Sequence, residues 1–224
     1  TRFNITIDPK MAFGTGHHQT TFMMCRALLE NEDAVKGKVV MDMGCGTAIL
    51  AILAAKMKAA KVYGIDIDAV AAISAYDNAR ANKVGKIVET YCGDASLLQR
   101  NTYDVLLANI NRNILLQDMP TYAHSLHKGG LLFVSGFYVE DMPMLMGMAA
   151  NCSLDYISHD SIDNWCCIKF CKNRKTVCIF YISVCVHSDI FITRNWLFSG
   201  TRITNVTAIN SILTWNTDCI NVAT

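Results

Sequence analysis

The feature that most constrains the fold is the stretch "VVMDMGCGTAILAILAA" at residues 39–55. Apolar and β-branched residues open it, Gly44 and Gly46 follow, and the remainder has helical composition. Glycine lets a backbone take positive φ angles and approach a ligand closely, and a helix begins with N–H groups that lack partners inside it. A strand, a glycine turn and a helix in this order are typical of nucleotide-cofactor sites in α/β proteins.

Strand-like and helical runs alternate from residue 39 to residue 151, and this order predicts a parallel sheet with helices on both faces. Strands are expected at residues 39–42, 61–68, 87–95, 103–110 and 131–137. Helices are expected at residues 51–60, 69–83, 112–130 and 140–151, and the third should end at Gly129 and Gly130.

Residues 152–172 depart from this alternation, because they hold two strand-like runs with no helical spacing between them. They predict a closing β-hairpin. A seventh strand inserted antiparallel marks the methyltransferases that use S-adenosylmethionine (SAM), whereas dinucleotide dehydrogenases continue with parallel units. We therefore predict an α/β, Rossmann-like SAM-dependent methyltransferase fold, with a mostly parallel seven-stranded sheet and a C-terminal antiparallel hairpin.

Acidic residues at the ends of the predicted strands narrow the choice of cofactor. Asp66 lies about twenty residues beyond the glycines, where a carboxylate can accept the ribose hydroxyls of either NAD or SAM. Ile49 stands where a dinucleotide fingerprint has its third glycine, which disfavours NAD. Asp42 precedes the glycines and would face the methionine part of SAM. Asp94 could accept from the adenine amino group or cap a turn, and Ile67 would pack on the adenine face.

Two asparagines end the strand predicted at residues 103–110. Ligands of open α/β sheets bind at the carboxyl ends of the strands. The amide carbonyl of Asn109 could therefore accept a hydrogen bond from a nucleophilic amine and aim its lone pair at a methyl group. Either asparagine could instead cap the following helix, and Asn111 suits that role better. Ile110 and Asn111, rather than two prolines, directly follow Asn109, which argues against amino-methyltransferases of the Asn-Pro-Pro type.

A glycine-containing loop, "DPKMAFGTGHHQTT" at residues 8–21, precedes the first predicted strand. It could close over the methionine end of the cofactor, and Thr20 or Thr21 could cap the helix that follows. His17 and His18 are adjacent, and no Cys or Asp lies nearby at ligand spacing, so no metal site is predicted.

The composition limits the classes of partner and compartment. The net charge of +1 gives no electrostatic case for direct nucleic-acid binding, and the ten cysteines are scattered rather than regularly spaced. The opening residues have no basic-then-apolar pattern, so we expect no signal segment, and the longest late apolar run, at residues 176–186, is too short to span a bilayer. We expect a soluble, cytoplasmic monomer with no membrane partner.

Several stretches together resemble the methyltransferases of ribosomal protein L11, and within that family the versions from Bacteroides-like bacteria. The resemblance covers about residues 4–171. The matching stretches are "IDPKMAFGTGHHQTT", "VVMDMGCGTAILAILA", "VYGIDID", "GDA", "YDVLLANINRNILL", "GGLLFVSGFY" and "NWCCIKF". The first and fifth are fairly specific to the family. The resemblance implies SAM-dependent methylation of lysine side chains and of the N-terminal amine of L11.

The resemblance also implies roles for single residues. The loop residues implied to bind the cofactor and border the amine site are Phe13, Gly14, Thr15, Gly16 and His18. The methionine part of the cofactor is implied to be held by Asp42, Gly44 and Gly46, the ribose by Asp66 and the adenine by Asp94. Ile67 and Ala95 are also predicted to bind the cofactor. Asn109 is implied to lie at the methyl group as the catalytic residue.

Ala48 departs from the family pattern, because a third glycine is common at its position. We expect Ala48 to take a negative φ, with its amide facing the methionine end of the cofactor. A positive φ, or a methyl group that blocks the pocket, would count against the proposed chemistry.

The family also carries an N-terminal substrate-recognition domain, and this sequence is expected to lack it. We divide the chain into residues 1–36, with the linker end, glycine loop and leading helix; residues 37–171, the SAM-binding domain; and residues 172–224. The last stretch is expected to be a β-rich appendage, a disordered tail or non-native sequence. Alternative functions are methylation of another substrate, or SAM binding with little activity.

Overall fold

The computed structural model describes residues 2–8, 17–100, 102–173, 179–186 and 190–197. The chain divides into two compact units, Thr1–Arg174 and Lys175–Thr224. The strands of the first unit are β1 (Val39–Met43), β2 (Lys61–Asp66), β3 (Val88–Cys92), β4 (Tyr103–Asn109), β5 (Leu126–Tyr138), β6 (Leu154–Ile162) and β7 (Trp165–Lys172). Its α-helices are α1 (Gln19–Glu30), α2 (Glu32–Val35), α3 (Ile49–Lys56), α4 (Ala69–Ala81), α5 (Arg112–Ser125) and α6 (Met142–Asn151). Short 3₁₀ turns are η1 (Ala95–Leu97) and η2 (Val139–Asp141).

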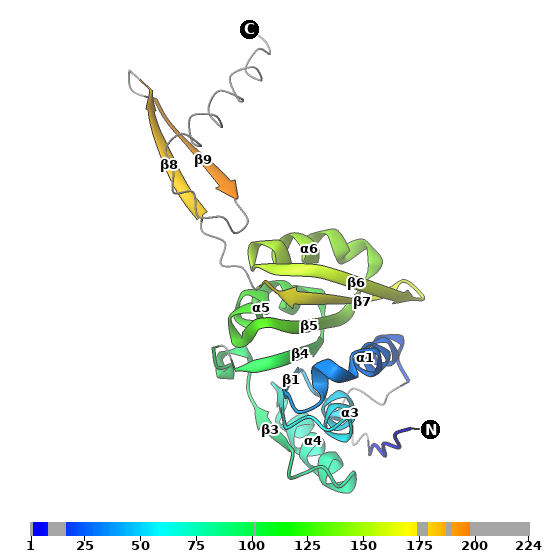
Figure 1. Ribbon diagram of the computed structural model, residues 1–224. Helices are drawn as coiled ribbons and strands as arrows, with labels where there is room; N and C mark the ends of the chain where they lie inside the picture. Colours follow the sequence, from blue (N-terminus) through cyan, green and yellow to red (C-terminus); the bar gives the residue numbers. More distant parts are fainter. Residues whose placement is uncertain (1, 9–16, 101, 174–178, 187–189, 198–224) are drawn as a thin grey trace. The chain divides into compact units, whose positions relative to one another are not determined.

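The first unit is built on one seven-stranded sheet in the order β3-β2-β1-β4-β5-β7-β6, with helices on both faces (Figure 1). The neighbouring strands among β3, β2, β1, β4 and β5 all pair in parallel, and β7 pairs antiparallel with both β5 and β6. The predicted Rossmann-like methyltransferase fold with its closing antiparallel hairpin is therefore confirmed. The second unit contains an antiparallel pair, β8 (Ile179–Val186) and β9 (Ile190–Leu197). None of the described helices has the length and apolar composition needed to cross a bilayer.

The alternation of side chains along the central strands produces a hydrophobic core on each face of the sheet. In β4, Val105 and Leu107 point to the face covered by α1, α3 and α4, whereas Leu106 points to the face covered by α5 and α6. All three side chains are fully buried. Strands covered on both faces read as continuous apolar runs, which is why these segments were recognisable in the sequence.

Helix α5 ends earlier than its glycines suggested. It stops at Ser125, and β5 begins at Leu126, so the prediction of a helix reaching Gly129 and Gly130 is wrong. Leu126 is fully buried, and extending the helix would withdraw it from its pairing with β4. The glycines instead lie in β5 at a register shift in the β4–β5 pair. The backbone of the two strands is close there, because a Cβ on Gly130 would lie 3.0 Å from the carbonyl oxygen of Asp104.

The turn after β1 is attached to the end of β2 by backbone hydrogen bonds. The amides of Gly44 and Cys45 both donate to the carbonyl of Ile65, at 2.8 and 3.1 Å. Gly44 has φ +65°, and a Cβ built on it would lie 2.3 Å from Cγ2 of Ile110. Only glycine satisfies both the backbone angle and this close approach.

The close approach predicts a specific coupling between two positions. Gly44→Ala should lower the free energy of unfolding by about 2–4 kcal/mol, because left-handed backbone strain and overpacking add. The cost should be smaller by about 1 kcal/mol or more in an Ile110→Ala background, since that change removes Cγ2 and leaves only the strain. Urea unfolding of the two single variants and the double variant measures the coupling. Strictly additive effects would contradict the contact.

Candidate functional site

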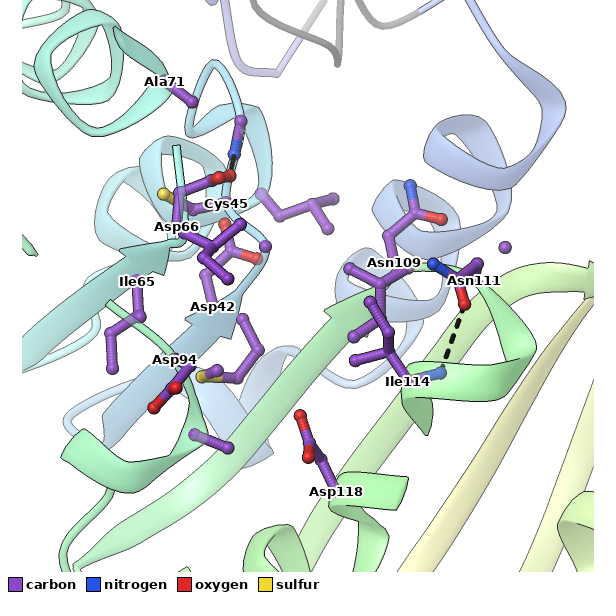
Figure 2. A pocket seen from close by; sticks show the side chains of 18 of the residues that line it. Asp42, Cys45, Ile65, Asp66, Ala71, Asp94, Asn109, Asn111, Ile114 and Asp118 are labelled. Atoms are coloured by element: carbon purple, nitrogen blue, oxygen red, sulfur yellow. Dashed lines mark hydrogen bonds between the residues drawn. The ribbon is translucent and has the colours of Figure 1, made fainter. Parts of the chain in front are cut away.

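A cavity of about 1040 Å³ opens at the carboxyl ends of the central parallel strands. Every predicted site residue that the structure describes lines it. These residues are His18, Asp42, Gly44, Gly46, Asp66, Ile67, Asp94, Ala95 and Asn109. The predicted loop residues Phe13, Gly14, Thr15 and Gly16 lie outside the described part of the chain. Figure 2 shows Asp42, Asp66 and Asp94 along one side of the cavity, with Asn109 across from them.

Asp66 is held by two backbone amides at the end of β2. Its Oδ2 accepts from the amide of Gly46 at 2.8 Å, and its Oδ1 accepts from the amide of Asp68 at 3.0 Å (Figure 2). Each carboxylate oxygen retains a further lone pair, and the side chain is only partly buried. The carboxylate is thus fixed in orientation and can still accept hydrogen bonds from the hydroxyl groups of a ligand in the cavity.

Asp42 lies at the floor of the cavity and is 1% exposed. Its Oδ2 accepts from the amide of Ala51 in the first turn of α3, at 3.1 Å, and so satisfies one of the free N–H groups of that helix. Burial raises the pKa of Asp42 to about 7; the hydrogen bond from Ala51 opposes the shift, and the nearby carboxylate of Asp66 adds to it.

The structure contradicts the expected conformation of Ala48. Its φ is +64°, so the prediction of a negative angle is wrong, and its amide donates to the carbonyl of Cys45 at 2.7 Å rather than facing a ligand. The amide of Ala48 is therefore removed from the candidate ligand donors, and this positive φ counts against the proposed chemistry at the methionine end of the cofactor. The methyl group does not block the pocket, because Ala48 is fully buried and packs into the core beside α1 and α3. Burial of this methyl group offsets part of the cost of left-handed backbone.

The adenine end predicted from the sequence lies at η1 and the end of β2. Asp94 accepts from the amide of Ser96 at 2.9 Å and so caps η1. It also lines the cavity, so the capping role leaves room for the predicted contact to the adenine, which stays a prediction. Hydrogen bonds from the hydroxyl and amide of Ser96 lower the pKa of Asp94, which keeps it ionised. Ile67 is 78% exposed and lines the cavity, so its side chain is accessible to a flat ring packed on it.

Asn109 ends β4 and carries a free acceptor. Its Nδ2 donates to the hydroxyl of Thr21 in α1 at 3.3 Å. Within the described residues its Oδ1 accepts no hydrogen bond and remains accessible. Asn111 caps α5 instead, accepting from the amide of Ile114 at 3.2 Å (Figure 2), as its position in the sequence suggested. The two neighbouring asparagines therefore have different tasks.

The N-terminal side of the cavity is formed by α1 and the start of β7. His18 is the N-cap of α1 and accepts from the amide of Thr20 at 3.3 Å, so the prediction that Thr20 or Thr21 caps this helix is wrong. Both threonines are buried in its first turn. The imidazole of His18 packs edge-on against Trp165, with ring centroids 4.8 Å apart, and Trp165 also lines the cavity.

Sequence reasoning missed the wall that α5 contributes. Its cavity residues are Ile114, Gln117, Asp118, Thr121 and Tyr122. Their spacing of three to four residues places them on one face of the helix. The same spacing can be read in the sequence after Asn109, and it could have predicted that this face of the helix lines the cavity. Burial raises the pKa of Asp118.

The charge of the lining is strongly one-sided. Five aspartates line the cavity, at positions 42, 66, 68, 94 and 118, and no Lys or Arg lies among the described lining residues. Such a surface favours a cationic ligand and opposes the pyrophosphate of a dinucleotide. The described residues also contain no group of three His, Cys, Asp or Glu side chains that could hold a metal ion.

A family model for "Ribosomal protein L11 methyltransferase (PrmA)" matches residues 1–173. The chain belongs to the ribosomal protein L11 methyltransferase family. A family member from Phocaeicola vulgatus is 46% identical over 171 residues, which are 76% of this chain and 60% of that protein. One from Bacteroides thetaiotaomicron is 42% identical over 75% of this chain and 59% of that protein. The chain thus spans about 60% of the length of these curated relatives.

Solved structures agree with this family and with its fold. The crystal structure of ribosomal protein L11 methylase from Lactobacillus delbrueckii subsp. bulgaricus has a TM-score of 0.68 and 28% identity, and the match covers 75% of this chain and 85% of that chain. A SAM-dependent methyltransferase from Aquifex aeolicus has a TM-score of 0.59 at 15% identity, with 75% of this chain and all of that chain covered; it supports the fold alone.

The buried state of Asp42 predicts a pH dependence of stability. Because its folded pKa is about 7 and its unfolded pKa is near the ordinary value of about 3.9, the folded state binds more protons between these limits. The free energy of unfolding should therefore fall as the pH rises from about 4 to about 7. Asp42→Asn should remove this component, and urea unfolding at several pH values measures the difference between the two proteins. Identical slopes between pH 5 and pH 7 would contradict the burial argument.

Proposed function

We propose that the cavity binds SAM and that the protein transfers its methyl group to lysine and N-terminal amines of ribosomal protein L11. The observation that carries this proposal is the free carbonyl of Asn109 opposite a wall of aspartates. Family membership supports the substrate, because the matching relatives are named for L11.

The lining fits SAM better than NAD. SAM carries a positive sulfonium and an amino group, and the aspartates that line the cavity would stabilise both charges. Asp66 would hold the ribose hydroxyls, Ile67 would pack on the adenine, and Asp94 would accept from its amino group. Asp42, Gly44 and Gly46 would hold the methionine part. The loop residues 13–16 and His18 stay predicted contributors to this end.

When bound, SAM would supply an electrophilic methyl group, so no metal is required. A lysine amine has a pKa near ~10.4 in solution and must be neutral to act as a nucleophile. Removal from water and a nearby positive charge both lower that pKa. The Oδ1 of Asn109 would accept an N–H of the amine and direct its lone pair, while Thr21 fixes the amide. Most of the acceleration would come from this alignment.

The proposal also concerns the organisation of the chain and its setting. Residues 37–171 would carry the methyl-transfer site, and residues 1–36 would add its loop and leading helix. Residues 172–224 are given no part in it. The cytoplasmic location, the monomeric state and the lack of direct nucleic-acid binding stay predictions. SAM-dependent methylation of another substrate, and SAM binding with little activity, stay as alternatives.

Asn109→Ala tests the catalytic assignment. With SAM saturating, the single-turnover rate of methyl transfer to isolated L11 should fall about 100-fold or more, because the amine loses its alignment. The affinity for SAM should change little. Asn113→Ala is a matched control, since Asn113 lies on α5 outside the cavity lining and should keep the wild-type rate. An Asn109→Ala protein with the full single-turnover rate would show that the assignment is wrong.

A further inference from the structure

Two asparagines bind the backbone of the N-terminal segment at residues 2–8: Asn78 in α4 and Asn82 at the C-cap of that helix. Asn82 accepts from the amide of Thr6 at 3.0 Å and donates to its carbonyl at 2.6 Å. Asn78 accepts from the amide of Asp8 at 2.9 Å and donates to its carbonyl at 3.2 Å. Four helical residues advance by about 6.0 Å and two extended residues by about 6.6 Å, so the two pairs fit the same register.

Exposure alternates along this segment, as expected for an extended chain lying on a core. The side chains of Phe3, Ile5 and Ile7 pack against the core that α1, α3 and α4 cover. The residues between them are exposed. The two asparagines therefore satisfy backbone groups of the segment, which pairs with no strand in the described part of the chain.

Asn78 makes one contact that Asn82 does not. Its Nδ2 also donates to the carbonyl of Thr47 at 3.1 Å. Thr47 is fully buried in the turn between β1 and α3 and follows Gly46, which lines the cavity. Asn78 itself is 2% exposed, and both ends of its side-chain amide make hydrogen bonds. Its Nδ2 donates to the carbonyls of Asp8 and Thr47, and its Oδ1 accepts from the amide of Asp8. A flipped amide would oppose all three partners.

We propose that Asn78 is a positioning residue of the cofactor site, which couples the segment at residues 2–8 to the turn at residues 44–48. This inference rests on the proposed function, because SAM is the ligand expected at that turn. Without Asn78, the buried carbonyl of Thr47 loses the hydrogen bond from Nδ2, and the backbone of Asp8 loses the pair of hydrogen bonds that Asn78 makes with it. Coupling of this kind is reciprocal, so ligand binding at the turn should also order the segment.

Asn82→Ala is the matched control for Asn78→Ala. Both changes remove an amide that binds the same segment, and both should lower thermal stability. Only Asn78→Ala removes a contact to the turn. Measured by calorimetry, its dissociation constant for SAM should rise about tenfold or more, while that of Asn82→Ala stays within about threefold of wild type.

Hydrogen exchange of wild-type protein provides a second test that needs no variant. SAM should slow exchange in the turn and also at the amide of Asp8, which lies outside the cavity lining. In Asn78→Ala the protection at Asp8 should be lost while protection in the turn persists.

Equal shifts of SAM affinity in the two variants would overturn the inference, as would wild-type protection confined to the turn. Failure of wild-type protein to bind SAM would overturn the proposed function and the inference together. The two failures are therefore distinguishable.

Discussion

The site depends on the attachment of the glycine turn to the end of β2. The carbonyl of Ile65 accepts hydrogen bonds from the amides of Gly44 and Cys45, and the carboxylate of Asp66 accepts one from the amide of Gly46. These bonds fix the turn and the acidic side chain against each other, so neither can move without the other. The position at which α3 begins, and the direction in which Asp66 points, both follow from this attachment.

Two further connections complete the cavity around that turn. The fourth strand lies beside β1 in parallel, so its last residue, Asn109, reaches the same edge of the sheet as Asp42. The antiparallel β7 returns along β5 and brings Trp165 to the same cavity. The closing hairpin is thus part of the site as well as of the fold. The opposing wall is acidic, and this combination of charge and geometry favours a cationic methyl donor and an amine acceptor.

Much of the fold was predictable because its signals are local. Buried parallel strands appear as apolar runs, and the acids at their ends occupy the edge where ligands bind in open α/β sheets. What failed depended on tertiary packing. Ala48 has a left-handed backbone with its methyl group buried in the core, and α5 stops at Ser125 because Leu126 is buried in β5. The bond from Asn109 to Thr21 joins residues 88 positions apart and has no local signature.

The central claim is that the cavity is built for SAM, and a calorimetric titration tests it most directly. Purified protein is titrated with SAM and, in a separate run under the same conditions, with NAD. The account predicts saturable binding of one SAM per chain and no detectable heat of binding with NAD, because the aspartates that line the cavity repel a pyrophosphate. Binding of NAD without binding of SAM would contradict it.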